Sequence, residues 1–359
     1  MKKQALLLAG AMLAGAACAQ SSVTLYGVID AGIASRSGGS GAAPSAERMT
    51  EIGSGMGSGG SRWGLRGAET LSPGLTAFFE IEWGFEGDTG QGTTAFGDGL
   101  LRTRHNHVGL SGSAGTFLLG RVDGGRATFA KVYDPFKGAG VGGFGGLATQ
   151  LTTVNNAMVY ISPSWQGLSV TGAYVTAGTG EEQPGNVGDT RIYVIWPTYK
   201  IGNLQISWDH EEVWVSKSNY PRLKVDELGA TYDFGIAKVF GQFDRTRSSG
   251  GAFNNVLDDQ KAWMLGASVP VSAEGLLKAS YGRVKRDNLA DFSCSKVAIG
   301  YEHRLSKRTH LYADAARISN SSGANCQLGL RNEDGNLENF ASKPVYGTRG
   351  FDVGIAHSF

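Results

Sequence analysis

The sequence is poor in charged residues and in proline, and its composition excludes several classes of protein. Charged residues make up 18% of the 359-residue chain, whereas an average soluble domain carries about 25%. Only 9 residues are proline and the 55 glycines follow no three-residue period, which excludes a collagen-like chain. Aromatic residues reach 10%, too many for a disordered chain. The formal net charge of +1 gives no sign of a nucleic-acid partner.

The N-terminal residues have the pattern of a secretory signal. Lys2 and Lys3 precede an apolar run, and Ala17-Cys18-Ala19 forms a small-residue cleavage site. We predict that residues 1–19 are removed and that residues 20–359 form one domain. No later stretch approaches the roughly 18 consecutive apolar residues that indicate a transmembrane helix.

Apolar and polar residues alternate with period two over almost all of the remaining chain, which is typical of β-strands. The C-terminus shows this clearly, because Phe351, Val353, Ile355 and Phe359 share one face and Asp352 lies on the other. The alternation predicts about 16 strands, near 22–35, 60–70, 75–86, 101–111, 116–122, 156–162, 168–176, 189–200, 203–214, 223–233, 236–246, 259–269, 276–286, 295–305, 309–318 and 345–359.

The connections between these strands are short at one end and long at the other. Turns such as Leu71–Gly74 and Ser306–Arg308 alternate with polar, Gly-rich stretches such as Arg36–Gly60 and Asp123–Asn155. This pattern is typical of an all-β fold, a transmembrane antiparallel β-barrel. In lipid the last strand must pair with the first, because an open edge leaves backbone polar groups unsatisfied. A soluble β-sandwich is the alternative, but it needs a second apolar core, whereas the partner faces here are polar and suit a watery lumen.

Several segments resemble the general porins of Gram-negative bacteria, of the type found in Neisseria and in Burkholderia-like bacteria. They follow the order of that family along the mature chain: Ser21–Asp30, Ser61–Glu69, Val108–Gly112, Leu119–Arg121, Asp134–Phe136, Leu305–Thr309 and the terminal Phe359.

The resemblance implies a 16-stranded barrel among outer-membrane lipids, usually a homotrimer, that passes small ions and hydrophilic solutes by passive diffusion. It implies that the third long loop folds into the barrel and narrows it. It also implies that Phe359 is the signal read by the outer-membrane barrel-assembly machinery.

Charges at the narrowest point of such a pore set its selectivity. Arg62 and Arg66 share a strand face, and so do Arg102 and Arg104. Because an arginine facing lipid at the bilayer midplane would cost about 2–4 kcal/mol, we place all four in the lumen. By the resemblance, Arg62 and Arg104 match the basic cluster of porins that prefer anions.

Arg121 breaks the alternation, because it shares a face with Phe117 and Leu119. It lines the pore only if a β-bulge turns it inward, and otherwise it lies at the rim. Both interpretations stay open at this point.

The third long loop, Asp123–Asn155, supplies the other constriction candidates, Asp134 and Lys137. A loop of about 33 residues is too long for a mere connection, and by the resemblance Asp134 belongs to the constriction. Glu80 and Glu82 point inward from the third strand and oppose an anion preference. We therefore expect an anion preference that is weak to moderate.

The sequence carries no pattern that indicates catalysis, a cofactor or a metal. His105 and His107 have no third ligand at a convincing spacing, and strict alternation places them opposite Arg104, toward lipid or near the outer rim. The hydrolase patterns G-x-S-x-G and H-E-x-x-H are absent. An outer-membrane barrel enzyme, with its site assembled from separate strands, and an adhesin with binding loops remain the alternatives to a porin.

Cys294 and Cys326 fall in the last two long loops, at the same end of the predicted barrel. Neighbouring loops of an exported protein allow a disulfide between them, and two free thiols are the alternative.

Overall fold

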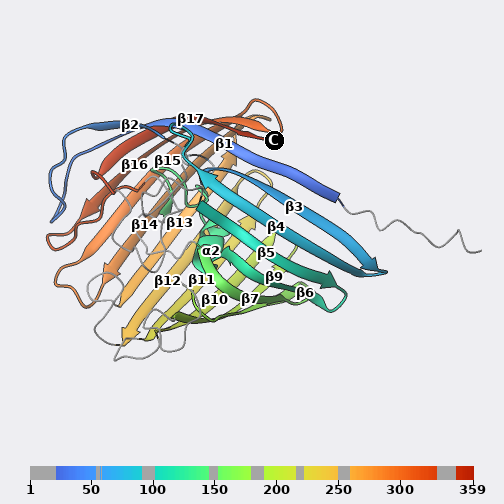
Figure 1. Ribbon diagram of the computed structural model, residues 1–359. Helices are drawn as coiled ribbons and strands as arrows, with labels where there is room; N and C mark the ends of the chain where they lie inside the picture. Colours follow the sequence, from blue (N-terminus) through green and yellow to red (C-terminus); the bar gives the residue numbers. More distant parts are fainter. Residues whose placement is uncertain are drawn as a thin grey trace, which may run out of the picture.

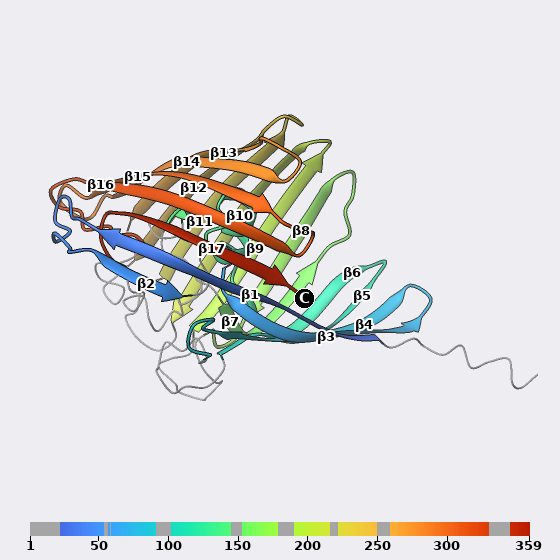
Figure 2. The same cartoon turned by 90° about the horizontal axis from the view of Figure 1, so that it is seen from above.

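Antiparallel strands run from one end of the chain to the other and close into a single barrel (Figures 1 and 2). A computed structural model of the protein describes residues 22–53, 57, 59–90, 102–144, 153–178, 190–215, 222–249, 259–329 and 345–359. The predicted signal, residues 1–19, lies outside the described residues.

The sheet contains 17 strands. They are β1 (Ser22–Ser37), β2 (Met49–Gly53), β3 (Ser61–Ser72), β4 (Leu75–Phe85), β5 (Arg102–Gly112), β6 (Gly115–Asp123), β7 (Thr153–Ile161), β8 (Leu168–Val175), β9 (Thr190–Ile201), β10 (Leu204–Val215), β11 (Arg222–Asp233), β12 (Lys238–Ser249), β13 (Gln260–Pro270), β14 (Gly275–Arg286), β15 (Ser293–Arg304), β16 (Thr309–Asn320) and β17 (Arg349–Ser358).

Sixteen of these strands match the sixteen predicted segments, and the predicted barrel is confirmed. The additional strand, β2, pairs with residues 32–36 of β1, while β3 pairs with residues 22–28 of the same strand. β2 and β3 therefore share one position in the wall, so 17 strands fill 16 positions. The five residues of β2 are too few for their alternation to be recognised in the sequence.

The last strand closes the barrel by pairing with the first, from Val28 opposite Ser358 to Ser37 opposite Arg349. The C-terminal residue continues this ladder, because Gly27 N–H donates to the Phe359 carbonyl at 3.2 Å and Phe359 N–H donates to the Gly27 carbonyl at 3.0 Å. The terminus is therefore held by the same hydrogen bonds that hold the strands.

The Phe359 ring lies on Gly27, and this contact predicts a measurable loss of stability on substitution. A Cβ at position 27 would lie 2.4 Å from Phe359 Cζ and 2.7 Å from the Arg62 carbonyl oxygen. Gly27→Val is expected to displace the ring and to destabilise the barrel by about 1–3 kcal/mol, as overpacking does. The measurement is the temperature at which unboiled barrel loses its fast migration in a denaturing gel.

Gly172→Val is the matched control, because a Cβ at Gly172 meets no atom within 4 Å. Equal unfolding temperatures for the two variants would show that the ring does not depend on Gly27.

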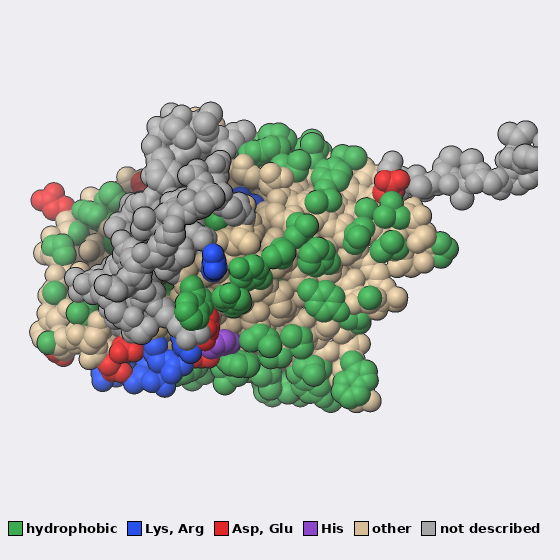
Figure 3. Space-filling view, turned by 60° about the horizontal axis from the view of Figure 1, so that its bottom comes forward, with side chains coloured by type: hydrophobic (Ala, Val, Ile, Leu, Met, Phe, Trp, Pro, Cys, Tyr) green, Lys and Arg blue, Asp and Glu red, His purple; other side chains and the backbone are tan. Residues whose placement is uncertain are grey.

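The outer surface of the barrel wall is apolar. Phe351, Val353 and Ile355 are 40–45% exposed, whereas Asp352 is fully buried on the inner side, as the alternation predicted. Hydrophobic side chains spread over the wall, and charged ones gather at one end (Figure 3). None of the helices in the described ranges is long and apolar enough to cross a membrane.

The inner surface is less polar than expected. Leu118, Val159, Val175, Ile192 and Val213 point inward from β6 to β10 and form an apolar cluster with their neighbours. The expectation of polar inner faces is therefore wrong for this part of the wall. Where both faces of a strand are apolar, period two no longer shows which face is inside.

The chain between β6 and β7 enters the barrel, as predicted for the third long loop. Helix α2 (Gly125–Tyr133) lies inside and contacts β10, β11 and β12 (Figure 1). The loop residues that follow, Asp134–Phe144, are buried except for Lys137. We call residues 124–144 the inner loop.

Candidate pore constriction

Arginines of β3 and β5 stand on the inner face of the barrel and form what we call the basic wall: Arg62, Arg66 and Arg104. Arg104 Nε donates to Glu82 Oε1 at 2.7 Å, and Arg62 Nε lies 3.4 Å from Glu82 Oε2. Arg66 is exposed and its guanidinium lies 5.1 Å from the centre of the Tyr26 ring. The strand alternation placed these three arginines on this face.

Glu80 and Glu82 also point inward, from β4, but they are engaged by other side chains. Glu82 is 3% exposed between the arginines. The Tyr26 hydroxyl lies 3.0 Å from Glu80 Oε1 and 3.1 Å from Glu82 Oε2, as a donor to either. The two carboxylates are therefore largely compensated, and they oppose an anion preference less than their number suggests.

A β-bulge at Arg104 corrects the predicted faces of β5. Glu82 is opposite His105 while Trp83 is opposite Thr103, so Arg104 is the extra residue. A bulge lets two successive residues share a face. His105 and His107 therefore face the lumen rather than lipid or the outer rim. Asn106, which strict alternation would place on the same face as Arg104, is exposed on the other side. Arg102 begins β5, and its side chain lies outside the described part of the structure.

His105 bridges two carboxylates. Its Nδ1 lies 2.6 Å from Glu80 Oε1 and its Nε2 lies 3.1 Å from Asp123 Oδ1. An imidazole with a carboxylate at each nitrogen donates from both, so this geometry favours the cationic form. Ligand atoms of Glu80, Glu82 and His105 lie within 4.8 Å of one another, close enough for a metal ion, but guanidinium, imidazole and phenol groups already bind these carboxylates.

Arg121 lies at a second irregularity, between β6 and β7. The register shifts between Gly120 and Val122, and Gly120 has φ +135°. Arg121 donates to the Thr103 carbonyl at 2.7 Å and to Thr153 Oγ1 at 2.6 Å. Of the two interpretations left open by the sequence, the structure shows the bulge. The two hydrogen bonds connect Arg121 to β5 on one side and to β7 on the other.

The inner loop lies flat against the opposite wall because that wall presents glycines. A Cβ at Gly229 would lie 2.5 Å from Tyr133 Cγ and 2.6 Å from Phe129 Cζ. Three more glycines receive loop side chains in the same way: Gly266 receives Pro135, Gly282 receives Phe144 and Gly300 receives Phe136. Only glycine permits such close approach, and the loop therefore covers β11, β13, β14 and β15.

Asp134 folds the loop instead of facing the passage. It is 1% exposed, and its carboxylate accepts N–H groups of Phe136 at 2.9 Å, Gly138 at 3.1 Å and Phe144 at 2.7 Å. Burial raises the pKa of Asp134, although these donors oppose the shift. Lys137, by contrast, is the exposed residue of this turn.

Polar groups of the barrel wall fix the loop at several points. Arg126, 2% exposed, pairs with Asp244 and lies 3.5 Å from Glu227. Val141 N–H donates to Asp352 Oδ2 at 2.6 Å, and Lys296 donates to the Gly143 carbonyl. The inner loop is thus fixed at β11, β12, β15 and β17.

The charged residues predicted for the constriction differ in exposure. Arg66 and Lys137 are exposed, the Arg62 side chain is 23% exposed, and among the acids the Glu80 side chain is 28% exposed but pairs with His105. Glu82 and Asp134 are both nearly fully buried. Such an arrangement favours anions in a pore.

Comparison with known proteins agrees with this architecture. A family model described as Gram-negative porin matches residues 5–323. The chain belongs to the Gram-negative porin family. Outer membrane porin protein 32 of Delftia acidovorans is 31% identical over 391 residues, which cover 100% of both chains. An outer membrane porin of Bordetella pertussis is 32% identical over 376 residues, covering 89% of this chain and 95% of that protein.

The solved anion-selective porin from Comamonas acidovorans is also similar to this porin, with 28% identity and a TM-score of 0.76 over 95% of this chain and 100% of that one. This porin is therefore an outer-membrane β-barrel that serves as a passive-diffusion channel, and its family relatives are channels rather than enzymes.

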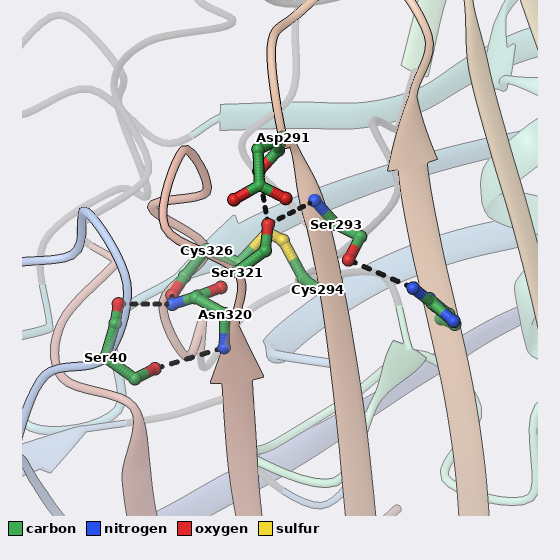
Figure 4. The surroundings of a disulfide bond; sticks show 8 residues. Ser40, Asp291, Ser293, Cys294, Asn320, Ser321 and Cys326 are labelled. Atoms are coloured by element: carbon green, nitrogen blue, oxygen red, sulfur yellow. Dashed lines mark hydrogen bonds between the residues drawn. A yellow bond between two sulfur atoms is a disulfide. The ribbon is translucent and has the colours of Figure 1, made fainter.

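A disulfide joins Cys294, at the start of β15, to Cys326, in the stretch after β16, with their Cα atoms 6.3 Å apart (Figure 4). The surrounding loops are bound to each other as well, since Ser293 N–H donates to Ser321 Oγ at 2.8 Å and Asn320 N–H donates to Ser40 Oγ at 3.2 Å.

The disulfide predicts the outcome of thiol labelling. Native oxidised porin is expected to take up no maleimide at Cys294 or Cys326, and reductant is expected to expose both. In the chain-entropy model a closed loop of 32 residues is worth about 3.7 kcal/mol, so Cys294→Ser/Cys326→Ser should make these loops easier to cleave with protease. Labelling of both cysteines without reductant would contradict the pairing.

Sequence reasoning missed the residues that position the loop. The glycines at 229, 266, 282 and 300 lie far from the loop in sequence, and glycine was too common to single them out. Arg126 is one of several charges in the third long loop, and its position in the sequence does not reveal its partners. Its carboxylate partners could be found in part from the sequence. Gln205, Ser207 and Asp209 alternate with Leu204, Ile206 and Trp208, and Glu211 continues the polar face, which places two acids on one face of a strand.

Proposed function

We propose that this porin prefers anions weakly to moderately and that its selectivity is set between the basic wall and the inner loop. The observation that carries the proposal is the difference in exposure between the two signs of charge. Arg66 and Lys137 are exposed, whereas the Glu82 and Asp134 carboxylates are buried and satisfied by hydrogen bonds or ion pairs, and the partly exposed Glu80 pairs with His105.

This difference acts at short range. At physiological salt the Debye length is about 8 Å, so distant charges of the loops and rims contribute little. Exposed cations at the narrowest section act on an ion that has already lost part of its surrounding water. The relative from Comamonas acidovorans, whose printed title calls it anion-selective, supports the same sign for this chain.

The proposal includes the path to the membrane and the assembly. Residues 1–19 direct export and are removed, Phe359 is read by the barrel-assembly machinery, and three copies associate among outer-membrane lipids. The family supports an oligomeric channel. The ordered C-terminal strand with its exposed Phe359 supports its use as a recognition element. We propose no catalytic activity and no cofactor.

Uptake into proteoliposomes tests the proposed selectivity. Aspartate and lysine are small solutes of similar size and opposite charge, and glycine is a neutral reference. We expect aspartate to enter faster than lysine at low ionic strength, with the difference shrinking as salt is added. Equal rates, or faster entry of lysine, would contradict the anion preference, and folded barrel without uptake of any of the three would contradict the channel function.

A further inference from the structure

A cavity of about 340 Å³ lies inside the barrel between the inner loop and β6 to β10. Its walls are apolar side chains of four neighbouring strands, among them Leu118, Val159, Ala173 and Val194. Gly125 and Thr128 of α2 also line it. The volume falls in the range of small-molecule sites, about 300–1,000 Å³.

Two polar groups at this cavity lack partners. Glu211 is 1% exposed, and no N–H or hydroxyl group of the described residues donates to its Oε2; its close polar neighbour is the Asp209 carboxyl, which can share a proton with it. Trp196 Nε1 is buried and also has no partner within the described part of the chain. Both residues line the cavity. Buried polar atoms are nearly always satisfied, so these two indicate an occupant that supplies what the protein does not.

The charge around Glu211 is negative. Asp209, Glu227 and Asp244 are buried beside it, and Arg126 is the cation that all four carboxylates face. Four acids face one base, so the cluster must either retain protons or gain a further cation to offset its negative charge. A buried charge is tolerated only when it is paired, and a cation reaching Glu211 through the cavity would provide such a pair.

The chemistry of the walls decides which kind of cation fits. Calcium or magnesium requires six or more oxygen ligands, or retained water. Besides Glu211, the described residues of the lining offer only the hydroxyls of Thr128, Thr171 and Thr198 and the carboxylate of Asp123, which is already paired with His105 and Lys131. An apolar cavity of about 150 Å³ already holds a benzene ring, so this one has room for a ring with a short chain. The face of Trp196 can also attract a cation.

We propose that this cavity binds small primary ammonium compounds with an apolar body, with the ammonium group at Glu211 and the body against the side chains of β6 to β9. The site lies beside the passage and is distinct from the basic wall. It goes beyond the proposed anion preference, because it would retain one class of organic cation in a pore whose passage favours anions.

The probe is 4-fluorophenethylamine, followed by ¹⁹F NMR with the full-length mature porin in detergent. The matched probes are 2-(4-fluorophenyl)ethanol, which is neutral, and 4-fluorophenylacetate, which is an anion of similar shape. We expect saturable binding of one amine per chain and binding of the other two weaker by about tenfold or more, because only the amine gains a charge-assisted hydrogen bond.

Two neighbouring residues provide matched variants. Ala173 lines the cavity, whereas Gly172 lies on the outer face, where a Cβ meets no atom within 4 Å. Ala173→Phe is expected to fill the cavity and abolish binding, and Gly172→Phe, which adds the same ring outside, is expected to leave it unchanged. Glu211→Gln is expected to reduce amine binding to the level of the alcohol. Single-channel conductance shows that each variant is folded.

Undiminished binding in Ala173→Phe would place the amine elsewhere and overturn the proposal. If the unmodified porin bound the amine, the alcohol and the acid equally, the cavity would be a site for any apolar molecule, detergent tails included. That result would overturn the ammonium preference without any need for the Glu211→Gln variant, and so even if that variant failed to fold. Neither result bears on the anion preference of the passage, which proteoliposome uptake measures separately.

Discussion

Replacing Arg126 with methionine is expected to detach helix α2 from the barrel wall and to widen the pore. Arg126 is the cation that Asp209, Glu211, Glu227 and Asp244 share, and it pairs directly with Asp244. Removing one partner of a buried ion pair costs about 3–5 kcal/mol. That cost falls on the contact between loop and wall, because the strands keep their own backbone ladders.

The measurement is the swelling rate of proteoliposomes in a series of oligosaccharides, together with single-channel conductance. We expect a larger exclusion size and a conductance higher by roughly twofold, since bore controls both. Lys131→Met is the matched control, because Lys131 is also on α2 but is 42% exposed in its pair with Asp123, and such pairs contribute about 0–1 kcal/mol. An unchanged exclusion size in Arg126→Met would show that the ion pair does not hold the loop.

Reversing two exposed cations at the passage is expected to reverse the selectivity of the pore. In Arg66→Glu/Lys137→Glu both exposed positive charges become negative, while the pairs of Glu82 with Arg62 and Arg104 are left intact. We expect a cation preference, with a change in the chloride-to-potassium permeability ratio on the order of tenfold for four units of charge in a narrow, partly desolvated section.

The control for this variant changes the same amount of charge away from the passage. Arg283 is exposed on the outer face of β14, and Arg308 is exposed in the turn between β15 and β16. Arg283→Glu/Arg308→Glu should leave the permeability ratio almost unchanged. If both double variants shifted the ratio equally, overall charge rather than the constriction would control selectivity.

The sequence was sufficient to predict the strands and their faces wherever the alternation is unbroken. In β1, β3, β4 and β17 one face is apolar and the other polar, so the inward direction of Arg62, Arg66, Glu80 and Glu82 followed from parity alone. Lipid on one side and water on the other make any other assignment costly.

Parity failed where a bulge inserts one residue. At Arg104 the inserted residue turned His105 and His107 inward. Near Gly120 a shift in the register between β6 and β7 changed the direction in which Arg121 points. The residues next to Arg104 give no sign of the first bulge, because a bulge depends on how β5 pairs with β4, a different segment of the chain.

The role of Asp134 was misjudged for a related reason. The sequence shows that a charge is in the loop, but its exposure depends on how the loop packs on glycines more than 80 positions away, such as Gly229 and Gly300. A carboxylate that could face ions instead accepts three backbone N–H groups. Contacts of this kind can be seen only when the distant segments are brought together.

The most direct test of the central claim is the zero-current potential of the unmodified porin in a planar bilayer under a KCl gradient. Exposed Arg66 and Lys137 beside buried Glu82 and Asp134 predict a potential with the sign of chloride permeation, which declines as the salt concentration on both sides is raised. A potential with the sign of potassium permeation would contradict the account, because it would mean that Glu80 and the other carboxylates of the lumen, rather than the basic wall, control the passage of ions.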